Sequence, residues 1–168
     1  KKKTSSDSGS APTPILVNDG ATDGPVGCAD FKDTCDTARY VGSMPGDLTG
    51  SITVSGFGSE WVKVKLREAD NNSFAAPMKM TARLQSPQGA KYEMKVHLDP
   101  LSPTPDCVSV LTGATADRAQ ATWGETADSP LYPYANGQED SRMVVLEIRF
   151  VGGTCDAKLP WHVVISGG

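Results

Sequence analysis

The side chains best suited to chemistry in this chain are carboxylates near its start. Five aspartates fall between positions 19 and 36. Oxygen atoms on a loop are the ligands that a calcium ion takes, about six to eight at a time. The spacing departs from the helix–loop–helix calcium loop, which places ligands at alternate positions and ends on a glutamate. Carboxylates that cap turns explain the same run, and we favour that interpretation. The candidate calcium ligands are Asp19, Asp23, Asp30 and Asp33.

Two histidines could act as bases. His97 shares the polar side of an alternating segment with Lys95, which predicts a solvated cross-strand position, and His162 follows Trp161 near the end of the chain. Neither stands in a motif of a serine hydrolase, a zinc protease or a phosphate-binding loop. Paired carboxylates could hydrolyse a glycoside, but loops of any acidic protein carry such groups. The sequence therefore predicts that the protein is not an enzyme. The carboxylates in question are Glu125, Asp128, Glu139 and Asp140.

Aromatic residues next to the irregular stretch 100–141 are the best candidates for a ligand platform. Exposed aromatic rings stack on sugars or on proline, although packing at the edge of a sheet explains them as well. Thioethers bind Cu(I), but the methionines occupy inward strand positions where core packing accounts for them. The sequence therefore predicts no cofactor, with calcium as the alternative. The candidate ligand-binding residues are Trp123, Tyr132 and Tyr134, and the methionines are Met78, Met80, Met94 and Met143.

Four cysteines indicate two structural disulfides. None of them stands in a Cys-x-x-Cys spacing, which disfavours a zinc or redox site. Three pairings are open. Cys28 and Cys35 are near enough to close a small loop, which would leave Cys107 to pair with Cys155. Disulfides place the protein in an oxidising compartment, so we expect it to be secreted, periplasmic or on a bacterial cell surface.

The composition of the chain disfavours some classes of binding partner. The chain has 168 residues, of which 16 are Lys or Arg and 20 are Asp or Glu, for a formal net charge of −4. Nucleic acid is an unfavourable partner, because no basic surplus exists to neutralise phosphates. No apolar run approaches the roughly 20 residues of a membrane-spanning helix. The length suits one domain with a core.

Alternation of apolar and polar residues with a period of two dominates residues 60–67, 78–85 and 92–99. Successive side chains of a strand point to opposite faces, so this pattern predicts an antiparallel sheet with one dry and one wet face. Residues 86–89 should form a tight hairpin turn. No segment keeps a helical period beyond two turns, and the protein should be all-β. Other strands are expected at 37–42, 48–56, 107–111, 120–123, 142–151 and 158–166, with a turn at 44–47.

The first 25 residues differ in composition from the rest. They are rich in Ser, Gly and Pro after three lysines, which predicts a flexible polar tether or linker over 1–25, with a short strand at 14–17 as the alternative. A start at Lys1 fits a mature protein whose targeting segment has been removed, with the tail as a lipoprotein-like spacer. Residues 26–168 should form a β-sandwich domain held by disulfides.

Four segments follow one another in an order that can be compared with known families. They are an entry at 37–42, a glycine-rich strand at 48–54, a strand led by Trp61 and a closing strand at 161–166. Over residues 37–168 this order resembles the bacterial pre-peptidase C-terminal domain family. The resemblance implies a jelly-roll-like antiparallel β-sandwich. It also implies a domain appended to exported proteins, with relatives that bind collagen, polysaccharide or calcium.

These observations favour a non-catalytic extracellular or cell-surface binding module that recognises a polysaccharide or a partner protein. The alternative is a structural subunit of a cell-surface assembly, in which residues 14–17 would add a strand to a neighbouring copy.

Overall fold

The computed structural model describes residues 27–69, 77–98, 107, 115–116, 120–125, 141–156 and 158–168. Within these residues the chain forms nine β-strands and no helix, so nothing there could cross a membrane as a helix. The strands are β1 (Arg39–Pro45), β2 (Gly50–Gly56), β3 (Glu60–Arg67), β4 (Lys79–Gln85), β5 (Ala90–His97), β6 (Thr115–Ala116), β7 (Gln120–Gly124), β8 (Arg142–Gly153) and β9 (Trp161–Gly167).

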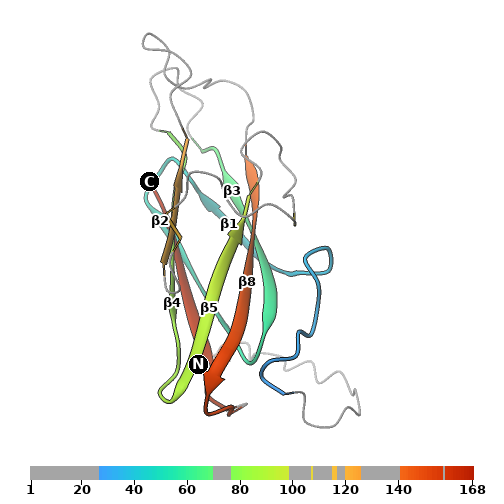
Figure 1. Ribbon diagram of the computed structural model, residues 1–168. Coiled ribbons are helices and arrows are strands. Elements are labelled where there is room, and N and C mark those ends of the chain that lie inside the picture. The colour runs from blue at the N-terminus through green and yellow to red at the C-terminus, as the bar shows by residue number, and fades with distance from the viewer. Residues whose placement is uncertain are drawn as a thin grey trace, which may run out of the picture.

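The strands form two sheets that face each other (Figure 1). The four-stranded sheet has the order β1-β3-β8-β5, and the five-stranded sheet has the order β2-β9-β4-β7-β6. Every pair is antiparallel except β1 with β3, which run parallel. The predicted all-β sandwich is therefore confirmed.

The connections follow a jelly roll. From β2 to β5 the chain changes sheet at every step, and β2 pairs with β9, β3 with β8 and β4 with β7. Such nested pairs arise when a long antiparallel ribbon folds over on itself, which is the jelly-roll topology. β1 adds one strand to this scheme at the edge of the four-stranded sheet.

The core lies between the sheets, where the inward side chains of both layers meet. Trp161, which is fully buried, donates its indole N–H to the Gly58 carbonyl at 2.9 Å. A Cβ at Gly56 would lie 2.3 Å from the Trp161 ring, so only glycine fits opposite this side chain. The predicted dry faces are confirmed at Val62, Val64, Leu66, Met78, Met80, Ala82, Leu84, Tyr92, Met94 and Val96.

Strand pairing differs from the expectation. The three alternating segments do not form one sheet, because β3 and β5 flank β8 while β4 belongs to the other layer. Residues 86–89 do turn, with Gly89 at φ +85°. They connect β4 to β5, which belong to different sheets, so the two strands do not form a hairpin. The predicted turn at 44–47 begins later, since β1 continues through Pro45. Alternation identifies the dry side of each strand, but it carries no information about which strand lies next to it.

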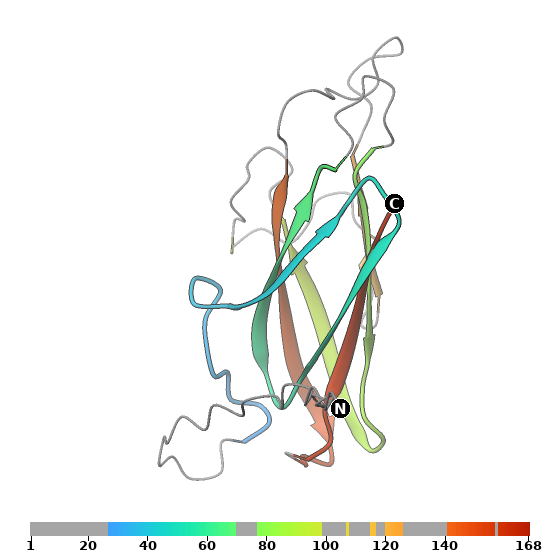
Figure 2. The ribbon, with the colours of Figure 1, turned by 180° about the vertical axis from the view of Figure 1, so that it is seen from behind.

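Residues 27–38, called the arm here, lie along the outer side of the four-stranded sheet (Figures 1 and 2). Phe31 forms an isolated parallel bridge with Ser59, and the Cys28 carbonyl accepts bonds from both the amide and the hydroxyl of Ser59 at 2.8 Å. The Ser59 hydroxyl oxygen in turn accepts the Phe150 amide at 3.0 Å. Ser59 thus links the arm to Phe150 of β8.

The disulfides hold the arm at its two ends, and the favoured pairing was wrong. Cys28 bonds Cys155 and Cys35 bonds Cys107, so no local loop is closed. Short spacing favoured Cys28 with Cys35, but the turns and bends of the arm carry the two sulfurs to different neighbours. The predicted tether at 1–25, including 14–17, lies outside the described residues.

Candidate functional site

The outer surface of the five-stranded sheet is the strongest candidate for a binding site, and it is called the hydroxyl face here. Its members occupy alternate positions of four strands, opposite the core-facing residues. All of them are exposed or half-buried. The hydroxyl face consists of Ser51, Thr53 and Ser55 of β2, His162, Val164 and Ser166 of β9, Lys79, Thr81, Arg83 and Gln85 of β4, and Gln120, Thr122 and Gly124 of β7.

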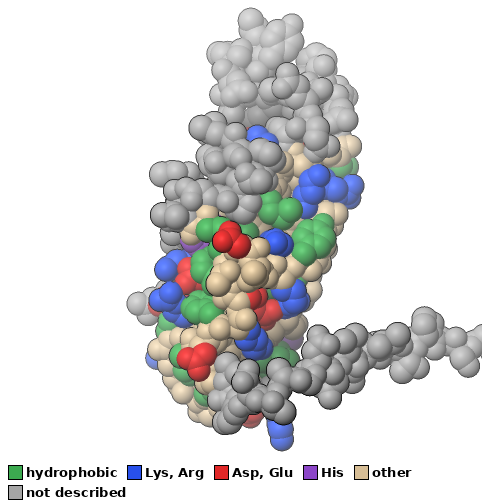
Figure 3. Space-filling view, turned by 90° about the vertical axis from the view of Figure 1, so that its right-hand side faces the viewer, with side chains coloured by type: hydrophobic (Ala, Val, Ile, Leu, Met, Phe, Trp, Pro, Cys, Tyr) green, Lys and Arg blue, Asp and Glu red, His purple; other side chains and the backbone are tan. Residues whose placement is uncertain are grey.

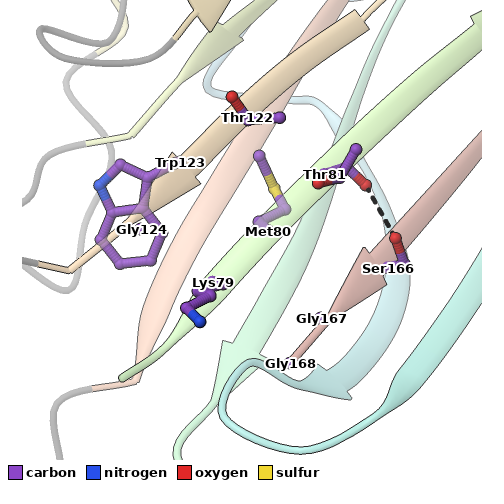
Figure 4. A pocket seen from close by; sticks show the side chains of 9 residues that line it. All are labelled: Lys79, Met80, Thr81, Thr122, Trp123, Gly124, Ser166, Gly167 and Gly168. Atoms are coloured by element: carbon purple, nitrogen blue, oxygen red, sulfur yellow. Dashed lines mark hydrogen bonds between the residues drawn. The ribbon is translucent and has the colours of Figure 1, made fainter. Parts of the chain in front are cut away.

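Four hydroxyl side chains form one straight row across this face. Ser51 pairs with Ser166, Ser166 with Thr81, and Thr81 with Thr122. Neighbouring strands are about 4.8 Å apart, which sets the spacing of the hydroxyls. The Ser166 hydroxyl reaches the Thr81 carbonyl at 3.5 Å (Figure 4). Each hydroxyl both donates and accepts hydrogen bonds, so the row offers repeated polar contacts to an extended ligand.

Charge on the hydroxyl face has one sign. Lys79 and Arg83 flank Thr81 on β4 and are exposed, and none of the strand positions of this face carries Asp or Glu. In the described part of the chain, no ion pair involves either cation. Glu125, which follows β7, directs its carboxylate to the Met78 amide at 2.9 Å. The described strand positions of this face thus carry two cations and no acidic side chain, although the protein is acidic overall.

A shallow depression of about 350 Å³ lies beside the row, at one end of the hydroxyl face. Gly124, Gly167 and Gly168 contribute no side chains there, which leaves space beside the hydroxyls of Thr81, Thr122 and Ser166 (Figure 4). Glycine is also required at Gly167, because a Cβ there would lie 2.2 Å from the Pro45 carbonyl oxygen. The remaining lining residues are Lys79, Met80 and Trp123.

At the other end of the hydroxyl face, Ser55 and His162 are in contact. The Ser55 hydroxyl lies 2.7 Å from His162 Nδ1, across the β2–β9 pair. A serine next to a histidine is the first element of a nucleophilic pair, which also needs a group that orients the histidine and a site that excludes water. Among the described residues no carboxylate is bonded to His162, and the pair lies on an exposed surface. The contact is suited to binding polar ligands.

The outer surface of the four-stranded sheet has a different character. Glu147 of β8 is only 4% exposed although it points away from the core. Its carboxylate accepts a bond from Arg149 at 2.8 Å and lies 3.5 Å from Lys95 and from His97. Three cationic or titratable neighbours around one buried carboxylate compensate for its lost hydration. Basic and acidic side chains are interspersed on this side of the molecule (Figure 3).

His97 was predicted to be solvated, and this prediction was wrong. Its side chain is on the outer side of β5, but the residue is 3% exposed and its ring centroid lies 5.2 Å from that of Trp61. Phe31 of the arm packs on Trp61 at 5.9 Å and lies under the Arg149 guanidinium at 5.6 Å. Alternation places His97 on the outer side correctly, but it does not show that this side is covered.

Asp33 connects the arm to β3. Its carboxylate accepts the Trp61 amide at 2.8 Å. Burial raises the pKa of the Asp33 carboxyl above its ordinary range, although the bond from the Trp61 amide opposes the rise. Asp30 accepts the Gly27 amide at 3.1 Å within its own turn. Both carboxylates thus satisfy backbone donors.

The calcium prediction is not tested by these contacts. Asp19 and Asp23 lie outside the described residues. In the part of the chain that the structure describes, no group of three or more His, Cys, Asp or Glu side chains converges. Calcium binding by Asp19, Asp23, Asp30 and Asp33 stays a prediction.

The aromatic candidates are not brought together within the described residues. Trp123 is 8% exposed, packs in the core from β7 and lines the depression. Tyr132 and Tyr134 lie outside the described residues. Met78, Met80 and Met94 are core residues, as their inward positions predicted. The inward position predicted for Met143 was wrong, because Val144, Leu146 and Ile148 of β8 face the core and Met143 is half-buried on the other side of the strand.

Sequence reasoning did not identify the hydroxyl row. Its signal is present, because Ser51, Thr81, Thr122 and Ser166 each occupy a polar position of an alternating segment. Their register across β2, β9, β4 and β7 depends on the order of the strands, which alternation leaves open.

No protein-family model matches the chain, and no curated protein does either. The resemblance to the pre-peptidase C-terminal family therefore stays a prediction. Among solved structures, the chain is similar to Aeromonas hydrophila PliG, a periplasmic lysozyme inhibitor of g-type lysozyme, at 11% sequence identity and a TM-score of 0.33. The match covers 77% of this chain and 98% of that chain. A TM-score of this size is too low to carry an argument about function.

Proposed function

We propose that this domain is a non-catalytic binding module of the cell exterior that binds an extracellular polysaccharide on the hydroxyl face. The observation that carries the proposal is the row Ser51–Ser166–Thr81–Thr122 on a face that lacks acidic side chains at its strand positions. An extended polymer can contact a row of this kind along its whole length, because each hydroxyl serves as donor and acceptor.

A protein partner is less well matched to this face. Protein interfaces depend on a few large anchors, most often Trp, Tyr or Arg, packed in desolvated pockets. At the strand positions of the hydroxyl face, Arg83 is the one residue of these three types, and it is exposed rather than packed in a pocket. Val164, at 43% exposure, is the largest apolar side chain there. The polar composition favours a hydrated ligand that exchanges water for hydroxyl contacts.

Location follows from the covalent structure. Two disulfides are typical of proteins in oxidising compartments, which include the periplasm, the cell surface and the medium. Polysaccharides are abundant in the same compartments, so the proposed ligand and the proposed location agree.

The test compares how well wild type and a variant with a blocked hydroxyl face are retained on immobilised polysaccharides. Thr81→Tyr places a ring in the middle of the row, and Lys91→Tyr places the same ring on an exposed position of β5 in the other sheet. We expect wild type and Lys91→Tyr to be retained and Thr81→Tyr to pass through. Equal retention of Thr81→Tyr, or no retention of wild type on any polysaccharide, would overturn the proposal.

Light scattering over a concentration series separates this function from its alternative. A binding module is expected to keep its monomer mass at every concentration. A mass that rises with concentration, and that no longer rises when residues 1–25 are deleted, would support assembly by strand addition instead.

A further inference from the structure

We propose that the ligand of the hydroxyl face is a polyuronate, a polysaccharide whose sugar units carry carboxylates, and that Lys79 and Arg83 bind those carboxylates. This inference rests on the proposed function and specifies its chemistry. The charge of the face carries it. The chain has four more acidic than basic residues in total, yet both formal charges at the strand positions of this face are positive.

The two cations flank the hydroxyl row, one on each side of it, so a polymer that follows the row passes between them. Lys79 and Arg83 are on the same side of β4 with Thr81 between them, so they lie about 13 Å apart at a strand rise of about 3.3 Å per residue. A guanidinium matches the two oxygens of a carboxylate in a bidentate pair, and a lysine ammonium binds as a point charge. Thr81 stands between them, and its hydroxyl and those of its neighbours in the row are available to sugar hydroxyls.

Other anionic polymers fit less well. A densely sulfated chain presents more charge than two cations can neutralise. Single-stranded nucleic acid binds to platforms of several stacked aromatic rings, and the strand positions of the hydroxyl face carry no Phe, Tyr or Trp. The low density of positive charge therefore favours a polymer with about one carboxylate on each sugar.

The experiment compares polygalacturonate with its methyl-esterified form, which has the same backbone without the charge. We expect wild type to bind polygalacturonate, to lose affinity as salt rises, and to bind the ester at least roughly tenfold more weakly, since hydrogen bonds to charged groups are worth more than neutral ones. Dextran sulfate is the third polymer. Tighter binding to it than to polygalacturonate would overturn the assignment of a polyuronate.

Matched variants locate the effect. Lys79→Gln with Arg83→Gln should weaken binding to polygalacturonate roughly tenfold or more, and Arg83→Lys alone should keep part of the affinity. The control, Lys65→Gln with Lys91→Gln, removes the same charge from the four-stranded sheet and should bind as wild type does. Equal weakening by both double variants would show that net charge alone acts, which contradicts the proposal.

The two proposals can fail separately. If wild type binds the ester as well as the acid, and Thr81→Tyr still abolishes binding, the polyuronate is wrong and the polysaccharide face stands. If Thr81→Tyr binds polygalacturonate unchanged, the hydroxyl face is not the site and both proposals fail.

Discussion

The two outer faces of this sandwich follow the same rule of alternation but differ in how far they are covered. On the four-stranded sheet, the outward side chains of Val145, Glu147 and His97 are no more than 4% exposed. On the five-stranded sheet, the outward side chains are exposed or half-buried throughout β2, β9 and β4. Alternation therefore distinguishes the core side of a strand from its outer side. Whether the outer side is exposed to solvent depends on other parts of the chain.

The arm explains part of this contrast. It places Phe31 over Trp61 and bonds Asp33 to β3, and its two disulfides hold it in place. Interactions on the covered face should therefore contribute to stability, because they are shielded from solvent. Interactions on the hydroxyl face should contribute little to stability. Its side chains can therefore contact a ligand without weakening the fold.

The largest expected effect comes from releasing the arm. Cys28→Ser with Cys155→Ser removes a bond between residues 127 positions apart and should lower the free energy of unfolding by about 2–5 kcal/mol. Urea denaturation followed by tryptophan fluorescence measures the loss. Cys35→Ser with Cys107→Ser provides the comparison, since the arm would keep its contacts with Ser59. An unchanged unfolding free energy in the first variant would contradict the stabilising role of the arm.

The next largest effect is a difference in stability between substitutions on the two outer faces. Glu147→Ala removes the acceptor of Arg149 and leaves the buried His97 without its carboxylate neighbour, which should cost about 1–3 kcal/mol. Thr81→Ala on the hydroxyl face should change stability by no more than about 0.5 kcal/mol. Thermal or urea unfolding of both variants checks the contrast, and equal losses would break it.

A smaller effect depends on pH. The folded-state pKa of Asp33 is raised, so the charged form is less favourable in the native protein than in the unfolded chain. Asp33→Asn keeps an oxygen acceptor for the Trp61 amide and should be at least as stable as wild type at neutral pH. Its advantage should shrink as the pH falls through the raised pKa towards the ordinary value of about 3.9. Melting temperatures measured across that range test the sign, and an advantage that grows in acid would refute it.

The smallest effect is expected at the Ser55–His162 contact. Because the pair is exposed, Ser55→Ala should alter stability by no more than about 0.5 kcal/mol. Hydrolysis of an activated ester should run at the rate of the protein-free solution, with either residue present or replaced. Hydrolysis that depends on both Ser55 and His162 would identify an enzyme and would break the assignment of this face to binding alone.

Part of this fold was predictable from local pattern. Inward positions such as Val64, Met80 and Met94 followed from alternation, because every second side chain of a strand must face the core. For the candidate site, only the polar positions of its individual residues were predictable. Thr81 and Ser166 each stood at a polar position, but they are 85 residues apart in the chain and adjacent in the sheet.

Local features of the sequence specify the all-β class, the dry side of each long strand and the presence of two disulfides. These properties depend on neighbouring residues or on residue counts. The folded chain is needed to establish which strands pair, which cysteines bond and which part of the outer surface is covered. Those outcomes depend on contacts such as Cys28–Cys155 and Phe31–Trp61, whose partners are distant in the chain and leave no trace in local periodicity.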